Sequence, residues 1–393
     1  MKRHISIFFF AFCLLLTSLS LAEEHTSTAT PATTTIAEKP HEPIANEHAT
    51  EAEHGNKDAS SVVVEHIMNH ISDANQFHVA TVSGKHFVIA LPCILYRNGK
   101  LSVFSSSRLE HDQEYDGYKL DEHSGRVVDA VTGKRSTNLG TYFTSHDSSK
   151  FLDFSITKNV FTSILGFIIL AILLFAAKKA YTNRKGQAPK GLQSIIEPIV
   201  QFLVDDVIKP NIGPKYEKFV PFLLSIFFFI LINNLIGLIP FFPGGANVSG
   251  NIAFTMTLAV LAFLMINING SKSYWGHIFA MPGVPKWVLV ILTPVEIVGL
   301  FIKPIALMLR LFGNITGGHI AILSIVSLIF IFGSLGKSIG GASLGGAMAI
   351  PIVLFVNAME LFVAFLQAYV FTLLTSIFIG AALEEHEHEH EHH

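Results

Sequence analysis

Apolar residues are gathered into long blocks in the second half of this chain, with little of the alternation that marks a half-buried strand. Five blocks are apolar enough to cross a bilayer: residues 160–177, 219–242, 252–268, 288–331 and 348–383. A spanning helix needs about 20 consecutive apolar residues. The pattern therefore predicts an all-α polytopic membrane protein with five transmembrane helices.

The last two blocks are longer than one perpendicular crossing requires. Either each forms a single, steeply tilted helix, or the block 288–331 contains two crossings. Glu296, Lys303 and Arg310 interrupt the first of these blocks, and Glu360 and Gln367 interrupt the second. Because such side chains avoid lipid, the pattern favours tilted helices that face a polar path or another protein.

The region before the first span has a different pattern. Residues 61–155 hold short β-like runs, such as 87–91 and 101–104, separated by Asn-Gly and Asp-Gly turns. These features predict a small β-rich element. Residues 23–60 are rich in Thr, Ala, Glu and His and cannot bury enough apolar surface to order, so a flexible tether is expected there. The histidines of 61–155 lack a compact ligand spacing, and no metal site is expected among them.

Sidedness follows from residues 1–22, which have the features of a secretory signal peptide. Lys2 and Arg3 precede an apolar run, and Ser20-Leu21-Ala22 forms a small-x-small cleavage site. The amino terminus and the β-rich element are then extracytoplasmic, and the basic residues that follow the first span mark the cytoplasm. Five crossings place the acidic, His-rich tail 384–393 in the cytoplasm. The expected location of the chain is the inner (plasma) membrane of a bacterium.

An amphipathic helix is predicted between the first two spans, lying along the inner membrane surface. Apolar residues recur there at helical spacing, and polar residues fill the other side. The apolar positions are Leu192, Ile195, Ile196, Ile199, Val200, Leu203 and Val207, and the polar positions are Gln193, Glu197, Gln201, Asp205 and Asp206.

Composition narrows the function further. Half of the residues are hydrophobic, only 15% are charged, and the net charge is −3. The sequence contains no basic stretch interleaved with aromatic residues, so nucleic-acid binding has no support. Cleavage of the signal peptide removes Cys13 and leaves Cys93 alone, and no intramolecular disulfide is expected. The Glu/His alternation of the tail is typical of metal-binding tracts, but a solvated tail is the simpler interpretation.

The main candidate for chemistry is Arg310, which lies within the apolar run 304–314. A guanidinium stays protonated, and a charge at mid-membrane costs about 2.5 kcal/mol or more. The competing interpretation is a snorkelling residue at a helix end, but apolar residues flank Arg310 for more than a turn on both sides. Asn314 lies one turn above it, and Gly313 and Gly317 form a small-xxx-small patch that would let a partner helix approach.

Helical geometry places other polar residues around this charge. At about 100° and 1.5 Å per residue, Glu296 lies about 40° from Arg310 and about 21 Å further in. His319 lies on the opposite side and about 13 Å further out. In the last helix, Glu360 and Gln367 are seven residues apart and share a face. Titratable groups at two depths, with a fixed positive charge between them, predict two offset half-paths.

Two short motifs indicate a family. The sequence reads Leu-Arg-Leu-Phe-Gly-Asn at 309–314 and Leu-Gln-Ala-Tyr at 366–369. In these motifs, and over about 160–383, the chain resembles subunit a of the F-type ATP synthase, the stator channel of a proton-driven rotor. The resemblance implies a membrane ion-channel domain over 156–383 in a non-catalytic subunit. The partners it implies are a ring of c subunits, peripheral-stalk b subunits and the lipid bilayer, with no cofactor.

The resemblance also implies roles for individual residues. Arg310 is the essential arginine that faces the c-ring, Gln367 lies near it, Glu296 belongs to the cytoplasmic path and Asn234 to the outward path. The full set of expected proton-translocating residues is Arg310, His319, Glu360, Gln367, Glu296, Asn314 and Asn234.

The chain departs from the most familiar family pattern at two linked positions. That pattern has an acid nine residues after the arginine and a histidine seven residues before the glutamine. Here these positions hold His319 and Glu360, the same pair exchanged. The exchange keeps one acid and one imidazole in the outer half-path, so proton relay is expected to survive. Gly237 stands where many members have an aspartate, which argues against a need for an acid there.

A secondary cation or metal transporter is the alternative, suggested by the His-rich ends and by His319 and Glu360. Such a transporter needs several ligands at one depth, and the sequence offers only this pair. A nucleotide-hydrolysing enzyme, suggested by Gly336-Lys337-Ser338, is excluded because Ile331 stands where a phosphate loop needs glycine. Neither a metal site nor enzyme activity of the chain on its own is expected.

Overall fold

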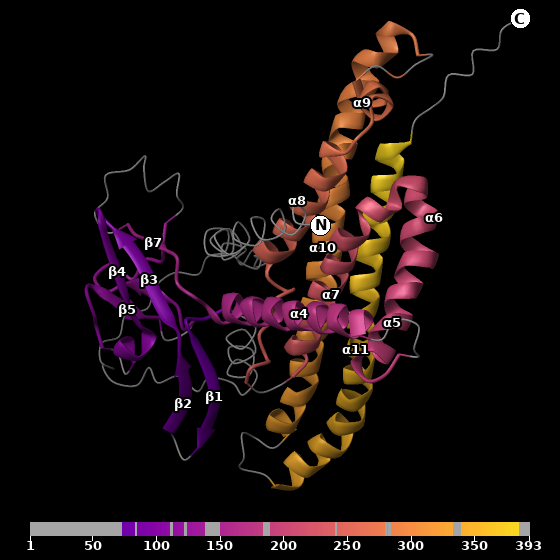
Figure 1. Cartoon of the computed structure of the whole chain (residues 1–393). Coiled ribbons are helices and arrows are strands. Elements are labelled where there is room, and N and C mark those ends of the chain that lie inside the picture. Colours follow the sequence, from indigo (N-terminus) through magenta and orange to yellow (C-terminus); the bar gives the residue numbers. More distant parts are fainter. Residues whose placement is uncertain are drawn as a thin grey trace, which may run out of the picture.

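A β-rich element joined to a group of long helices makes up the computed structural model of the chain (Figure 1). The structure describes residues 73–384, except for 83–84, 111–112, 122–123, 138–149, 184–188, 240–241, 280, 282–283 and 333–338. The expected signal peptide at 1–22, the tether at 23–60, the tail beyond Glu384 and Gly336-Lys337-Ser338 lie outside the described residues.

The described part of the region before the helices forms antiparallel strands. β1 (Gln76–Val82) pairs with β2 (Lys85–Ala90), and β5 (Tyr118–Leu120) pairs with β6 (Val127–Asp129). β3 (Pro92–Arg97) lies between β4 (Lys100–Ser105) and β7 (Leu152–Asp153), and the short helix η2 (Ser106–Leu109) follows β4. Asn98 and Gly99, with φ angles of 48° and 82°, close the turn from β3 to β4, as the Asn-Gly pair favours.

A small apolar core holds the β-rich element together. Phe77 of β1 packs edge-on against Phe161, at 5.8 Å between ring centroids, and against Phe242, at 5.4 Å. These contacts attach the element to the helices.

Burial raises the pKa of the Cys93 thiol to about 12, so the thiol stays protonated at physiological pH. The buried core residues are Cys93, Leu95, Phe104, Leu109, Tyr118, Val127 and Phe151.

Helices make up the rest of the described chain. In order they are α4 (Lys158–Asn183), α5 (Leu192–Phe202), the π-helix η3 (Leu203–Ile208), α6 (Lys209–Ile212), η4 (Gly213–Lys218), α7 (Val220–Gly237), α8 (Ile252–Ile268), α9 (Lys272–Phe279), α10 (Lys286–Phe332) and α11 (Ile339–Leu383). Within the described ranges, α4, α7, α10 and α11 are long and apolar enough to cross a membrane. The pair α8 and α9, bent by 104°, brings the number of spans to five if it counts as one.

The block 288–331 forms a single helix, α10, which settles one of the two interpretations left open by the sequence. The helix has 47 residues and continues through Pro294 and Pro304. At 1.5 Å per residue it is about 70 Å long, more than twice the apolar thickness of about 30 Å. It therefore fits a bilayer only if it is steeply inclined. In Figure 1, α4 runs across α10 and α11 at a large angle. This angle is expected if α4 crosses the bilayer nearly perpendicularly and the two long helices are steeply inclined.

The segment 192–207, predicted as an amphipathic helix, is helical in the structure as α5 and η3, with α6 following it. Ile196, Leu203 and Val207 are buried, whereas Ile195 is 66% exposed and Gln193 is only 6% exposed. At 100° per residue, Gln193 lies closer than Ile195 to the centre of the buried face. The face of this segment that packs against the rest of the chain therefore includes Gln193 and leaves Ile195 exposed.

Candidate functional site

Arg310 lies on an open face of α10. Leu307 and Leu311 on the same helix are buried against the helical core, whereas Leu309 and Arg310 are exposed. Within the described part of the chain, no carboxylate forms an ion pair with the guanidinium. The guanidinium is therefore an exposed charge on an apolar helix, without an ion-pair partner among the described residues.

The glycines beside Arg310 also face outward. A Cβ added at Gly313 or at Gly317 would meet nothing within 4 Å. The small-residue patch is therefore not used for packing among the described residues. It adds an open, flat surface to the face that carries Arg310.

Asn314, one turn after Arg310, joins α10 to α11. Its Nδ2 donates a hydrogen bond to Oε1 of Gln367 at 2.8 Å, and Gln367 is only 2% exposed. The two motifs singled out in the sequence thus meet at this bond. It fixes the position of α11 relative to Arg310.

Glu360 lies half-buried on α11, against Gly318 of α10. A Cβ added at Gly318 would collide with Oε1 of Glu360, so a larger residue there would require this carboxyl group to shift. That oxygen is buried and has no hydrogen-bond partner among the described residues. His319 follows Gly318 directly in α10, but its side chain lies outside what the structure describes.

Asn234 of α7 connects to α11 one turn away from Glu360. Its Oδ1 accepts a hydrogen bond of 2.5 Å from the hydroxyl of Ser249, and its Nδ2 donates to the carbonyl oxygen of Ala364 at 3.3 Å. Ala364 is four residues after Glu360, so the two lie on the same side of the helix. Asn234 therefore contacts α11 one turn from Glu360, and it also binds Ser249, which the sequence did not indicate.

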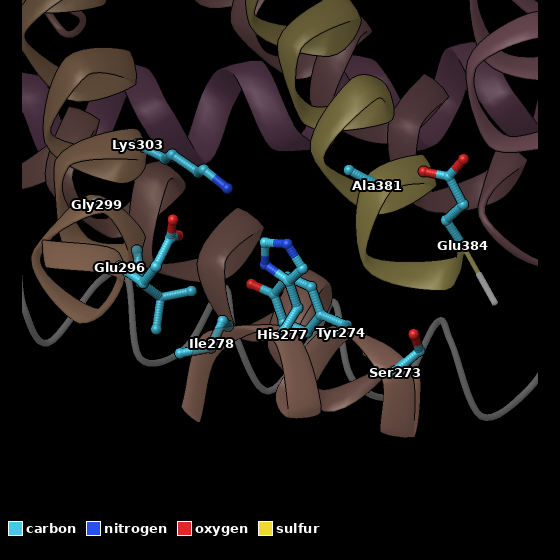
Figure 2. Close-up of a pocket in the computed structure, with 10 residues that line it drawn as sticks. Ser273, Tyr274, His277, Ile278, Glu296, Gly299, Lys303, Ala381 and Glu384 are labelled. Carbon is cyan, nitrogen blue, oxygen red and sulfur yellow. The ribbon is translucent and has the colours of Figure 1, made fainter. Parts of the chain in front are cut away.

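Glu296 lies apart from this group, in a cavity of about 280 Å³. Figure 2 shows Glu296, Lys303 and His277 pointing into the same space, with Glu384 on the far side at the end of α11. Glu296 and Lys303 are seven residues apart on α10, a spacing that predicts a shared face. His277 and Glu384 were missed by sequence analysis, because only the bend between α8 and α9 and the end of α11 bring them here.

The predicted site residues thus fall into two groups with Arg310 between them along α10. One holds Asn234, Glu360 and the hydrogen bond from Asn314 to Gln367. The other is the cavity around Glu296. Among the described residues, no three His, Cys, Asp or Glu side chains are placed to hold one metal ion.

Comparison with known proteins gives consistent family matches. A family profile described as "ATP synthase A chain" matches residues 160–380, and one described as a domain of unknown function matches 66–154. "ATP synthase subunit a 2" of Chlorobaculum tepidum is 45% identical over 239 residues, which cover 58% of this chain and 64% of that protein. "ATP synthase subunit a" of Chlorobium phaeobacteroides is 42% identical over 242 residues, covering 60% and 67%.

The match extends beyond these bacteria. "ATP synthase subunit a" of an Anaeromyxobacter species is 41% identical over 244 residues, covering 60% of this chain and 56% of that protein. The chain spans about two thirds or less of the length of these three relatives. Because the first profile includes more than half of the residues, the chain belongs to the ATP synthase A chain family.

Proposed function

We propose that this chain is the stator channel subunit of a rotary F-type ATP synthase and conducts protons through two offset half-paths separated by Arg310. The observation that carries the proposal is Arg310 itself: a permanent charge on an exposed face of an inclined apolar helix, unpaired among the described residues. Along α10, Asn314 on one side of Arg310 belongs to the group with Gln367, Asn234 and Glu360. Glu296 on the other side lines the separate cavity. A cation so placed acts as a barrier to protons and as a partner for a passing carboxylate.

The partner at this face is a ring of c subunits. The face carries large exposed apolar side chains that lipid alone could cover, but lipid gives no counter-charge for a guanidinium. A rotating set of helices, each with one carboxyl group, supplies both apolar contact and charge. The large exposed apolar side chains within about ten residues of Arg310 on α10 or of Glu360 on α11 include Ile305, Leu309, Ile320, Leu354, Phe355, Met359, Leu361 and Phe362. Peripheral-stalk b subunits are the further partners that family membership suggests.

The outward half-path uses Asn234, His319 and Glu360. A proton arriving from outside reaches Glu360, whose buried Oε1 has no competing partner among the described residues. From there the proton neutralises a rotor carboxylate. The neutral group then turns through lipid, which an ionised carboxylate does not do cheaply.

The inner half-path uses Glu296 and the cavity around it. After nearly a full turn, the rotor group releases its proton toward Glu296, and as an anion it is drawn to Arg310. The same cavity is lined by the cationic side chain of Lys303 and the titratable side chain of His277, at the point where the proton leaves the half-path. The membrane potential drives the step with about 2.3 kcal/mol per charge per 100 mV.

Orientation completes the proposal. The β-rich element lies outside the cytoplasm, the carboxyl terminus lies inside, and five spans cross the inner membrane of a bacterium. Nucleotide chemistry belongs to other subunits, so this chain is a non-catalytic component of the complex.

The test is an Arg310→Ala variant in the intact complex, reconstituted into vesicles. We expect ATP-driven proton pumping to fall to background while the amount of co-purifying ring stays at the wild-type level. Sustained coupled pumping in this variant would contradict the proposal. Metal uptake by the chain alone in liposomes would favour the transporter alternative instead.

A further inference from the structure

The short helix α9 is tied by hydrogen bonds to both of the long helices. At its start, the backbone N–H of Ser271 donates to the carbonyl oxygen of Ala382 at 2.8 Å, and the hydroxyl of Ser271 donates to the carbonyl oxygen of Glu384 at 3.2 Å. At its end, the hydroxyl of Thr293 donates to the carbonyl oxygen of Phe279 at 3.3 Å. α9 is therefore fixed to α11 at one end and to α10 at the other.

Tyr274 fixes the rotation of α9 about its own axis. Its backbone N–H donates to the hydroxyl of Ser271 at 3.0 Å, and its phenol O–H donates to Oδ1 of Asn267 on α8 at 3.2 Å. A Cβ added at Gly270 would lie 2.7 Å from a ring carbon of Tyr274, so the ring rests on the backbone at the bend between α8 and α9. These contacts decide which face of α9 points inward.

The inward face of α9 carries polar and titratable side chains. Buried faces of short helices are usually apolar. Here Phe279 is exposed, whereas His277 is half-buried and lines the cavity of about 280 Å³ around Glu296. Figure 2 shows the imidazole of His277 pointing into the space that Glu296 and Lys303 also face. The residues of α9 that line the cavity are Ser273, Tyr274, His277 and Ile278.

Among the side chains that line this cavity, the imidazole of His277 is the one suited to exchange protons with water near neutral pH. Histidine ordinarily changes charge between about pH 5 and 8. A lysine ammonium ordinarily stays protonated there, and serine and tyrosine hydroxyls do not ionise. The charged groups that face His277 from the neighbouring helices are Glu296 and Lys303 of α10 and Glu384 at the end of α11.

We propose that His277 is the exit residue of the inner half-path and carries protons between Glu296 and the cytoplasm. This inference rests on the proposed function. The carboxylic acid of Glu296 gives its proton, directly or through water in the cavity, to one nitrogen of the neutral imidazole and becomes a carboxylate. The imidazolium then gives a proton to cytoplasmic water and returns to the neutral form. ATP-driven pumping uses the same steps in reverse.

The first test removes the imidazole in the intact complex, reconstituted into vesicles with the cytoplasmic side outward. We expect His277→Ala to slow ATP-driven charge transport about tenfold, less than the roughly hundredfold usual for a proton-transferring group, because water in the cavity replaces part of the transfer. The measurement is the initial rate at which the membrane potential develops, at equal amounts of co-purified ring. Lys272→Gln is the matched control and should keep the wild-type rate, because Lys272 lies on the exposed side of the same helix.

Chemical rescue distinguishes proton transfer from a structural role of the side chain. Imidazole in the outer medium should speed up the His277→Ala complex about threefold and leave the wild type and Lys272→Gln unchanged. Pyrazole has a ring of the same size but is not protonated near neutral pH, so it should have no effect. Membrane potential is measured in place of acidification because a weak base such as imidazole collapses a pH gradient.

Two results would overturn the inference. One is a wild-type rate for His277→Ala, and the other is a slow His277→Ala complex that imidazole does not speed up, since His277 would then only shape the cavity. Arg310→Ala, measured in the same series, separates the two proposals. If Arg310→Ala loses transport while His277→Ala keeps the wild-type rate, only the exit residue is wrong. If Arg310→Ala retains transport, the proposed function is wrong.

Discussion

Two arginines, one in the β-rich element and one in the membrane part, are used in opposite ways. Arg97 lies over the ring of Tyr118, at 4.4 Å, and its Nη2 donates to Asp129 at 2.6 Å. Arg310 is exposed and has no ion-pair partner among the described residues. Arg97 is therefore bound within the β-rich element, whereas the guanidinium of Arg310 is free to bind a group outside the described residues. The comparison leads us to expect that paired charges stabilise the structure of this chain and that unpaired charges serve the proposed proton path.

The largest expected effect comes from removing the other unpaired group. Glu360→Gln keeps the shape of the side chain but cannot release a proton, so we expect proton pumping to fall about hundredfold. The free energy of unfolding of the chain should stay unchanged, because that side chain has a buried oxygen without a partner among the described residues. The measurement is ATP-driven acidification of vesicles.

Glu217→Gln on the exposed helix η4 is the matched control and should pump at the wild-type rate. Wild-type pumping by Glu360→Gln would break the link between unpaired charge and function.

Next in size is the loss of a paired charge. Arg97→Ala leaves the carboxylate of Asp129, whose side chain is 4% exposed, without its cation. We expect the β-rich element to lose about 2 kcal/mol of stability, less than for a fully buried pair because Arg97 is partly exposed. Hydrogen exchange of the amides in β3 and β4 would measure this local loss.

Proton pumping by Arg97→Ala should stay near the wild-type rate, the reverse of the result for Glu360→Gln. Arg108→Ala, at an exposed position over the ring of Tyr115, should change neither quantity. A pumping defect in Arg97→Ala without any loss of stability would contradict the division between the two kinds of charge.

Substitutions at two glycines of α10, Gly318 and Gly313, should have smaller effects on pumping and stability. Gly318→Ala forces the carboxyl group of Glu360 to move, and we expect pumping to slow about fivefold, since misplaced reacting groups lose rate. A Cβ added at Gly313 meets nothing within 4 Å inside the chain, so Gly313→Ala should not lower the melting temperature and should raise it slightly, because alanine favours the helix. Equal pumping rates for Gly318→Ala and the wild type would mean that the position of Glu360 does not matter.

The smallest effect concerns an exposed pair. Hydrogen bonds from Lys100 and Ser102 hold the pKa of Asp116 below its ordinary value of 3.8. A lowered pKa stabilises the fold above the ordinary value, and this contribution is lost as the pH falls through the folded-state value. In the acid range below 3.8, the melting temperature should therefore fall slightly less for Asp116→Asn than for the wild type. Identical acid profiles would mean that the pair contributes nothing.

The sequence singles out polar residues that are rare within apolar blocks. It does not single out residues that matter only through their contacts with other helices. Arg310, Glu296 and Gln367 are conspicuous as polar positions in apolar blocks, and the block 252–268 coincides with α8. Composition did not decide whether 288–331 is one helix, because two spans would have the same hydropathy. Ser249 and Gly318 gave no local signal, since their importance comes from Asn234 and Glu360 on other helices.

Asp73 has a mechanical consequence for the first spanning helix. It caps the start of α4, and the carbonyl oxygen of Ala74 accepts from the N–H of Lys158 beside it. In the proposed orientation, the β-rich element outside the bilayer therefore fixes the depth at which α4 sits, and this depth does not depend on lipid thickness alone. In a thinner or thicker membrane, we expect the other spanning helices to change their tilt while α4 keeps its position.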